Sequence, residues 1–444
     1  MLSTRSALLA TDWPYHRPLF NLTVKLTFKE TLTLDQIMSL IETKWIHATF
    51  DTGQLKYPEL RQYLTKWMGF FFWKSEQDFR LERHISEIHL KTQKDLGQLI
   101  DALVLKPFEE GLSPWRGILV QIENSSKNQT VALLSWHHCM WDGFSTINLF
   151  SELTSSDIQK RDYSNKMKDF ERYRNQYYGT FCQKCLFLLR APYEIILANV
   201  ESYDPIQSNS WHLPQRELQR VWKTASGKKA IDIKLIKKVK AKFGVSFTSV
   251  LTAGITSATR NLMMKNPPRG VPEFINAGFP LPLPRHTKKL RNFWALTTLK
   301  LPVGEKDPVK RLFKIERRLQ RLKRSTKPVM SILLLPLLGG LFPWMLKFIF
   351  SNRYTSMTIS IMPGPSEEIK DSTGEITADG MEFYISLAQG NTGLGISALS
   401  YNGRISICAT VDGGIEDRHD LLQDLTDDVE KEMQELLALN VEES

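Results

Sequence analysis

Two adjacent histidines, His137 and His138, follow a short apolar, β-rich run in the first third of the chain. Asp142 and Gly143 come a few residues later, and apolar residues with helical spacing begin at Phe144. This pattern predicts a strand that ends at the histidines, a loop, and a helix that carries the chain away. A loop held between two such elements can fix a reactive side chain at the mouth of a cleft.

An imidazole in such a loop can act as a general base near neutral pH, bind zinc, or simply pack in the core. Neighbouring residues at a strand end project to opposite faces, so one histidine is expected to work and the other to pack. A catalytic zinc needs about three converging protein ligands. The flanks contain no spaced His, Glu or Cys pattern, so no metal is expected. A packed core histidine is the ordinary alternative, but the complete H-H-x-x-x-D-G pattern favours a site.

The composition is that of a globular protein, with 42% hydrophobic and 24% charged residues. A chain of 444 residues exceeds one ordinary core, so two lobes are expected. The net charge of +10 favours an acidic partner such as nucleic acid, anionic lipid or a phosphorylated ligand like coenzyme A. No RNA-binding aromatic motif or zinc-finger spacing is present, so nucleic acid is not expected. Much of the positive charge lies in one segment, at Lys310, Arg311, Lys314, Arg317, Arg318, Arg321, Lys323 and Arg324. The alternative to a binding surface for an acidic partner is that these residues form the solvated face of a helix.

The four cysteines are too few for a disulfide framework, and the N-terminus lacks the apolar core of a signal peptide. The catalytic part is therefore expected in a reducing compartment. Cys182 and Cys185 form a lone C-x-x-C within an apolar run, for which core packing is expected rather than zinc or redox chemistry.

Local patterns predict strands and helices in both halves, which indicates an α+β protein. In the first half, the strands should share one sheet. Strands are expected at 19–28, 78–85, 115–122 and 131–136, and helices at 31–45, 93–105 and 144–153. In the second half, strands are expected at 218–223, 293–301, 355–361, 381–388, 394–401 and 404–411, and helices at 232–242, 247–264, 306–325 and 417–438.

Three further patterns indicate where the regular elements are connected or interrupted. Residues 201–216 have little periodicity and should form the crossover between the lobes. Residues 273–283 run into Pro280, Pro282 and Pro284, which should prevent regular strand pairing. Asn402-Gly403 is a strong hairpin signal.

Residues 330–350 form the most hydrophobic stretch, with Lys347 as their only charge. The stretch is close to the minimum length for a bilayer span, but two prolines and two glycines break it into short pieces. We expect an interfacial membrane-binding hairpin here, with the preceding basic helix attracted to anionic headgroups. The alternative is a buried pair of helices.

Several short patterns follow one another in a fixed order along the chain. They are Asp78-Phe79 with His84, Pro114-Trp115, the histidine motif, Arg291-Asn292, Asp307-Pro308 with Arg311-Leu312, Met362-Pro363-Gly364-Pro365 and Ser400-Tyr401-Asn402-Gly403. In this order the chain resembles the wax ester synthase/diacylglycerol acyltransferase family of the CoA-dependent acyltransferase superfamily, over nearly its whole length. It departs from the family pattern at Ile361, at Phe247-Thr248 and in the Pro-Leu-Trp segment, which lacks its leucine.

The resemblance implies a two-lobed chloramphenicol-acetyltransferase-like fold, with residues 1–200 and 217–444 as the lobes and a mixed sheet with flanking helices in each. It implies an O-acyltransferase that moves a fatty acyl group from acyl-CoA to a long-chain alcohol or diacylglycerol, forming wax ester or triacylglycerol. Acyl-CoA would be the donor substrate, and no cofactor would be bound permanently.

The resemblance also assigns roles to residues. His138 would be the general base, and backbone N–H groups of the Asp142-Gly143 turn would face the developing oxyanion. Asp142 would brace the loop through an arginine, for which Arg285 is the expected partner. His137 and Gly143 would be structural, and the expected substrate contacts are Trp141, Asn292, Pro363 and Gly364.

The departures from the family pattern leave a second reading open, a membrane-peripheral lipid-binding protein with the same fold and little or no catalysis. Acylation of a small polar acceptor is a third. Because lipid substrates are reached at a bilayer, a membrane-associated location is expected, at the endoplasmic reticulum or a lipid droplet.

Overall fold

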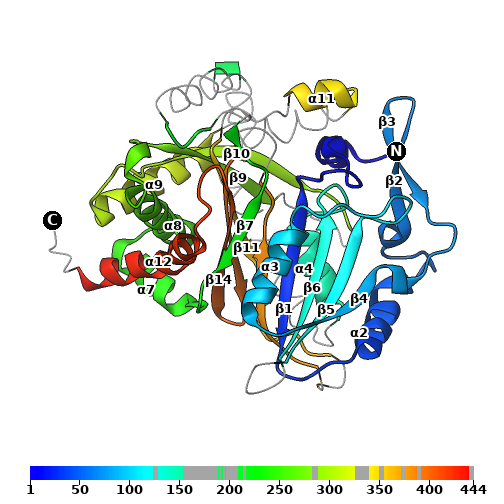
Figure 1. Cartoon of the computed structure of the whole chain (residues 1–444). Coiled ribbons are helices and arrows are strands. Elements are labelled where there is room, and N and C mark those ends of the chain that lie inside the picture. Colours follow the sequence, from blue (N-terminus) through cyan, green and yellow to red (C-terminus); the bar gives the residue numbers. More distant parts are fainter. Residues whose placement is uncertain are drawn as a thin grey trace.

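The computed structural model describes residues 1–123, 129–153, 209–213, 217–282, 289–325, 340–349, 355–371, 376–387 and 392–439, with single positions at 189, 192, 193, 196 and 374 (Figure 1). Most of the expected crossover 201–216, the Cys182/Cys185 pair, Arg285 and residues 330–339 lie outside the described residues. The chain forms two lobes, each a mixed sheet with flanking helices, so the predicted α+β class and two-lobed architecture are confirmed.

The first lobe is built on a five-stranded sheet in the order β12-β1-β6-β5-β4. Its strands are β1 (Asn21–Phe28), β4 (Ile85–Leu90), β5 (Trp115–Ile122), β6 (Gln129–His137) and β12 (Ala378–Tyr384). The pairing is antiparallel except between β4 and β5. Strand β12 comes from the second half of the chain and pairs with β1 along its length. The two lobes are therefore joined by backbone hydrogen bonds within one sheet.

Helices cover both faces of this sheet. Helix α3 (Gln93–Leu103) packs on one face, and α2 (Leu34–Ile41), followed by a π-helical turn (Glu42–Ile46), packs on the other. Both helices begin at capping boxes formed by Thr33 and Thr92, whose side chains accept hydrogen bonds from backbone N–H groups of the first turn. Helix α1 (Thr4–Leu9), a 3-10 turn (Ala10–Asp12) and α4 (Gly143–Ser151) complete the lobe.

A separate hairpin, β2 (Gln62–Trp67) and β3 (Phe70–Ser75), projects from the first lobe and pairs with none of the other strands that the structure describes. Short 3-10 turns lie on either side of it at Pro58–Arg61 and Leu81–Arg83. The predicted strand at 78–85 is wrong, because a 3-10 turn occupies this segment and the strand begins only at Ile85. The turn is held by His84, whose ring stacks on Trp115 and whose Nδ1 lies 3.1 Å from the Trp115 carbonyl.

The second lobe contains a larger sheet in the order β10-β9-β11-β13-β14-β7, with β8 paired to β14. Its strands are β7 (Trp222–Ser226), β8 (Ile231–Asp232), β9 (Ile275–Pro282), β10 (Trp294–Leu301), β11 (Met357–Pro363), β13 (Leu394–Tyr401) and β14 (Arg404–Asp412). The turn between β13 and β14 has positive φ angles at Asn402 and Gly403, which confirms the predicted hairpin.

The expectation that prolines would prevent pairing of residues 273–283 is wrong. Strand β9 pairs with β10 through Pro280 to Pro282. Because β11 pairs with β9 only at Ala277 and Gly278, the prolines lie on an edge where a missing N–H costs no ladder hydrogen bond.

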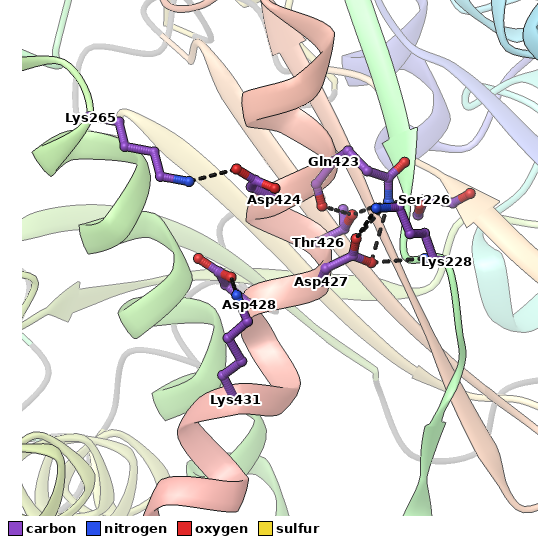
Figure 2. Close-up of polar contacts among 9 residues, drawn as sticks. All are labelled: Ser226, Lys228, Lys265, Gln423, Asp424, Thr426, Asp427, Asp428 and Lys431. Carbon is purple, nitrogen blue, oxygen red and sulfur yellow. Dashed lines mark hydrogen bonds and ion pairs between the residues drawn. The ribbon is translucent and has the colours of Figure 1, made fainter.

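Helices α7 (Ile233–Phe243), α8 (Phe247–Met264), α9 (Pro308–Arg324) and α12 (His419–Ala438) pack together with this sheet in one hydrophobic core. A 3-10 turn (Pro267–Arg269) follows α8, and α11 (Pro343–Ile349) lies beside α1 (Figure 1). The small residues of α8 permit a close approach to α12, since a Cβ at Gly254 would lie 2.6 Å from the Val429 carbonyl oxygen. Polar contacts fix the exposed side of α12, such as Lys265 to Asp424 at 2.6 Å and Gln423 Nε2 to the Ser226 carbonyl at 2.7 Å (Figure 2).

Candidate active site

A cavity of about 380 Å³ lies between the two lobes, next to the histidine motif. Its wall is mostly apolar and is built from both lobes and from β12. The lining residues that matter below are Leu8, Leu9, His138, Gly143, Trp294, Thr358, Ser360, Ile361 and Met362. The size and the apolar lining are typical of a small-molecule site.

His138 lies in the cavity wall, one residue beyond the end of β6. Its backbone is held on both sides: the N–H donates to the Phe20 carbonyl at 2.8 Å, and the carbonyl accepts from Asn292 Nδ2 at 2.7 Å. The ring is half-buried, and its Nδ1 is buried without a hydrogen-bond partner among the described residues. Trp294 lies across the cavity with its ring 6.1 Å from the His138 ring.

Burial lowers the pKa of His138 below its ordinary value of 6.5, and the nearby Asp142 carboxylate opposes this only in part. The imidazole is therefore neutral at physiological pH. A neutral imidazole facing an apolar cavity can accept a proton from a bound hydroxyl group.

His137 points away from the cavity, as the alternation along a strand requires. It is fully buried, with Nε2 3.0 Å from Asp12 Oδ1 and Nδ1 accepting from the Cys139 N–H at 3.3 Å. Burial alone would lower its pKa, but the Asp12 carboxylate reverses the direction and raises it. Both ring nitrogens are engaged, so this histidine is fixed in place.

Asp12 is a site residue that the sequence did not reveal. Its side chain is buried behind the histidines, where Oδ2 accepts from the N–H groups of Leu19 and Phe20 at 2.5 and 3.0 Å. Phe20 in turn accepts the His138 N–H. Asp12 thus holds both histidines, one directly and one through the backbone at the start of β1. Asp12 lies 125 positions before His137 in the sequence, so no local pattern connects the two residues.

Asp142 caps α4, where its Oδ1 accepts from the Ser145 N–H at 2.9 Å. Its Oδ2 accepts from the Phe293 N–H at 2.7 Å, and its own N–H donates to the Arg291 carbonyl. One carboxylate therefore ties the motif to the segment that leads into β10 of the other lobe. The expected partner Arg285 lies outside the described residues; the arginine described beside Asp142 is Arg291, whose pKa burial lowers and the carboxylate raises in part.

Gly143 begins α4 and lies in the cavity wall against Met362 of the second lobe. A Cβ at Gly143 would lie 2.1 Å from Met362 Sδ, so only glycine fits without a shift of the methionine. Within this first helical turn, the N–H groups of Ser145 and Thr146 donate to the side chain and to the carbonyl oxygen of Asp142.

The four predicted substrate contacts do not line the cavity. Trp141 is buried, stacks on Trp136 and donates from Nε1 to Thr146 Oγ1 at 3.0 Å. Asn292 is buried and donates to the carbonyls of His138 and Cys139, which supports the loop from behind. Pro363 and Gly364 end β11, and the absence of a Cβ at Gly364 allows close approach to the Ser400 carbonyl.

The arrangement is that of a two-lobed acyltransferase or condensation fold, with the histidine motif where the lobes meet. The chain belongs to the wax ester synthase/diacylglycerol acyltransferase family. The model of the wax ester synthase/diacylglycerol acyltransferase catalytic domain matches residues 47–251, and that of the WS/DGAT C-terminal domain matches residues 291–436. Family membership supports an acyltransferase.

Solved structures share the fold over nearly the whole chain. The wax ester synthase/diacylglycerol acyltransferase from Marinobacter aquaeolei VT8 has 17% sequence identity and a TM-score of 0.63, with 98% of both chains covered. Trichothecene 15-O-acetyltransferase from Fusarium sporotrichioides has 12% identity and a TM-score of 0.60, with 98% of this chain and 95% of that chain covered. The first condensation domain of the CDA synthetase has 11% identity and a TM-score of 0.57, with 99% and 96% covered.

A comparison with the sequences of curated proteins found no match. Among the helices that the structure describes, none combines the length and the apolar character needed to cross a bilayer. Within the same described residues, no group of His, Cys, Asp and Glu side chains is arranged to hold a metal ion.

Proposed function

We propose that this protein transfers a fatty acyl group from acyl-CoA to the hydroxyl group of a lipid, a long-chain alcohol or diacylglycerol, with His138 as general base. The observation that carries the proposal is the neutral His138 imidazole in the wall of a largely apolar cavity between the lobes. The products would be a wax ester or triacylglycerol and free CoA.

The chemical step needs one proton acceptor. With Nδ1 buried, Nε2 of His138 is the ring atom that can meet a substrate hydroxyl. The imidazole takes the hydroxyl proton while the oxygen attacks the thioester carbonyl and a carbon–oxygen bond forms. The tetrahedral intermediate then collapses, the carbon–sulfur bond breaks, and the departing thiolate takes the proton from the imidazolium. No acyl-enzyme is required.

The oxygen of the tetrahedral intermediate carries negative charge and needs hydrogen-bond donors. Two kinds of donor belong to residues that line the cavity. They are the backbone N–H of Gly143, in the first turn of α4, and the hydroxyl groups of Thr358 and Ser360 on β11. A backbone donor at a helix N-terminus adds the favourable end of the helix dipole.

The cavity wall favours apolar substrates. Leu8, Leu9, Trp294, Ile361 and Met362 leave few polar groups beyond those near His138, so long alkyl chains fit better than a polar acceptor. The family departure at Ile361 lies in this wall, and an isoleucine there adds apolar surface.

The basic segment contributes less to ligand binding than its charge indicates. Arg311 is buried in α9 and paired with Glu432 through Nε and Nη2 at 2.9 and 2.8 Å. Lys314 pairs with Glu305 at 2.6 Å. Exposed basic residues of α9, such as Lys310 and Arg321, are the proposed contacts for CoA phosphates. A location at the endoplasmic reticulum or a lipid droplet is part of the same proposal.

The test measures ester formation from radiolabelled acyl-CoA with long-chain alcohols, diacylglycerol and sterol, for wild type and His138→Ala. Loss of a general base should reduce kcat by about a hundredfold or more. The exposed His47, which lies outside the cavity, supplies a matched control in His47→Ala. A folded His138→Ala protein with wild-type kcat would overturn the proposal. Tight lipid binding without turnover by wild type would instead support a non-catalytic lipid-binding protein.

A further inference from the structure

The tip of the β2–β3 hairpin exposes two large apolar side chains. Trp67 is 65% exposed and Met68 is 72% exposed. The turn has positive φ angles at Met68 and Gly69, of 46° and 79°. Two-residue hairpin turns of this kind favour asparagine before glycine, and a methionine there is conformationally costly. The sequence thus places an apolar residue where neither solvent nor backbone conformation favours it.

A second exposed apolar element meets this tip. Phe342 and Trp344, at the start of α11, are 47% and 71% exposed. The Phe342 ring lies 5.1 Å from that of Phe70 and packs over Gly69. The hairpin and α11 lie together at one end of the molecule, beside α1 (Figure 1). We name the surface formed by Trp67, Met68, Phe342 and Trp344 the apolar rim.

Helix α11, which carries Trp344 of the apolar rim, also contacts residues of the cavity wall. Leu346 of α11 is buried against Leu8 of α1, and Trp294 packs against the same pair. Leu8 and Trp294 both line the cavity that contains His138. The same helix therefore contributes to the apolar rim and packs on the wall of the cavity.

The charges around the rim are positive. In the hairpin, Lys66 and Lys74 are exposed, and no acidic residue lies between Gln62 and Ser75. Residues 340–349 carry Lys347 as their only charge, and α1 carries Arg5. Exposed Trp and Phe side chains on segments whose only charges are positive are suited to a bilayer interface, where the rings enter the headgroup layer and the net positive charge attracts anionic lipid.

We propose that the apolar rim docks on the surface of an anionic phospholipid layer and brings the cavity close to that layer. Contiguous exposed apolar side chains mark an interaction site rather than ordinary surface. The positive charge of the surrounding segments favours an anionic lipid layer over a protein as the partner. The docking itself is independent of the proposed function; only the passage of a lipid acceptor into the cavity rests on it.

The test is co-sedimentation of the full chain with vesicles of phosphatidylcholine containing about a third phosphatidylserine. The double variant Trp67→Ser/Met68→Asn removes the hairpin tip, and asparagine suits the positive φ, so the hairpin should fold as before. Loss of two inserted side chains should weaken vesicle binding by about tenfold or more. The matched control is Val221→Ser/Met264→Asn, which removes two exposed apolar side chains from the second lobe.

Three results would overturn the inference: wild-type vesicle binding by the hairpin variant, an equal loss in the control, or a wild-type dimer that the hairpin variant dissociates without any vesicle binding. Salt should weaken binding, because the Debye length falls from about 10 Å at 0.1 M to about 3 Å at 1 M. The hairpin variant should keep its activity on a water-soluble alcohol and lose it on diacylglycerol in vesicles. Failure of the proposed function appears separately, as an active His138→Ala protein.

Discussion

Replacement of Asp12 by asparagine tests whether the residue behind the histidines positions the catalytic loop. An asparagine that keeps its oxygen toward His137 turns its NH2 group toward the N–H groups of Leu19 and Phe20, which lose their acceptor. In the flipped orientation the asparagine NH2 group faces Nε2 of His137. That nitrogen carries the ring proton, because Nδ1 accepts a hydrogen bond from the Cys139 N–H, so two donors face each other. Either orientation leaves donors unpaired in a site where the Asp12 side chain is 2% exposed.

Each unpaired buried donor costs about 1 to 3 kcal/mol, so Asp12→Asn should lower the free energy of unfolding by about 2 to 5 kcal/mol. Because Phe20 accepts the His138 N–H, the shift should also displace the base. A displacement of this kind can reduce kcat by roughly a hundredfold. KM should change little, since Asp12 does not line the cavity.

The assay combines chemical denaturation with steady-state ester formation well below the unfolding temperature. Asp51→Asn, at an exposed position, is the matched control. The reasoning fails if Asp12→Asn matches this control in both stability and kcat. A loss of stability with unchanged kcat would restrict Asp12 to a structural role.

Three further predictions follow from single features of the site and core. Burial lowers the pKa of His138, and the neutral imidazole is the proposed base, so kcat/KM should rise with pH through a midpoint below 6.5 and stay level above it; a midpoint above 6.5 would contradict the assignment. Gly143→Ala should reduce kcat/KM with only about 1 kcal/mol lost in stability, because Met362 must move, and Gly143→Ala/Met362→Ala should recover part of the activity; no loss in the single variant would refute this packing argument. Burial raises the pKa of Glu59 to about 7 from 4.5, so the folded state holds this proton more tightly and stability should fall as pH rises from about 5 to 8; Glu59→Gln should flatten that dependence in thermal melts, and an unchanged slope would count against it.

Much of the fold could be predicted because its elements have strong local patterns. Helix α8 and strands β5 and β13 begin and end where their periodicity predicts. The hairpin at Asn402 follows from the conformational preference of two residues. In each case the structure is decided by residues close together in the chain.

The features that the sequence did not reveal depend on distant contacts. Strand β12 was expected near residues 381–388, but alternation shows only that a strand is half-buried and not which sheet it joins. Its pairing with β1 brings together residues more than 300 positions apart. The β2–β3 hairpin was missed because its turn, Met68-Gly69, departs from the usual asparagine signal.

At the site, the geometry of the adjacent histidines could be anticipated from strand alternation, and the structure places His138 in the cavity wall and His137 behind it. The proposed contacts at Trp141 and Asn292 came from position in a motif, which does not distinguish a residue that meets substrate from one that supports the loop. In the structure both side chains are buried, and they donate hydrogen bonds to Thr146 of α4 and to the His138 carbonyl.

The exchange of β12 between the halves of the chain restricts how substrates enter. A hinge motion that parted the lobes would have to break the hydrogen bonds between this strand and β1, so the exchange opposes opening of the cavity by separation of the lobes. The same exchange means that a fragment ending near residue 200 would expose the bare edge of β1 to other chains. Such a fragment would aggregate rather than fold as an independent half-enzyme.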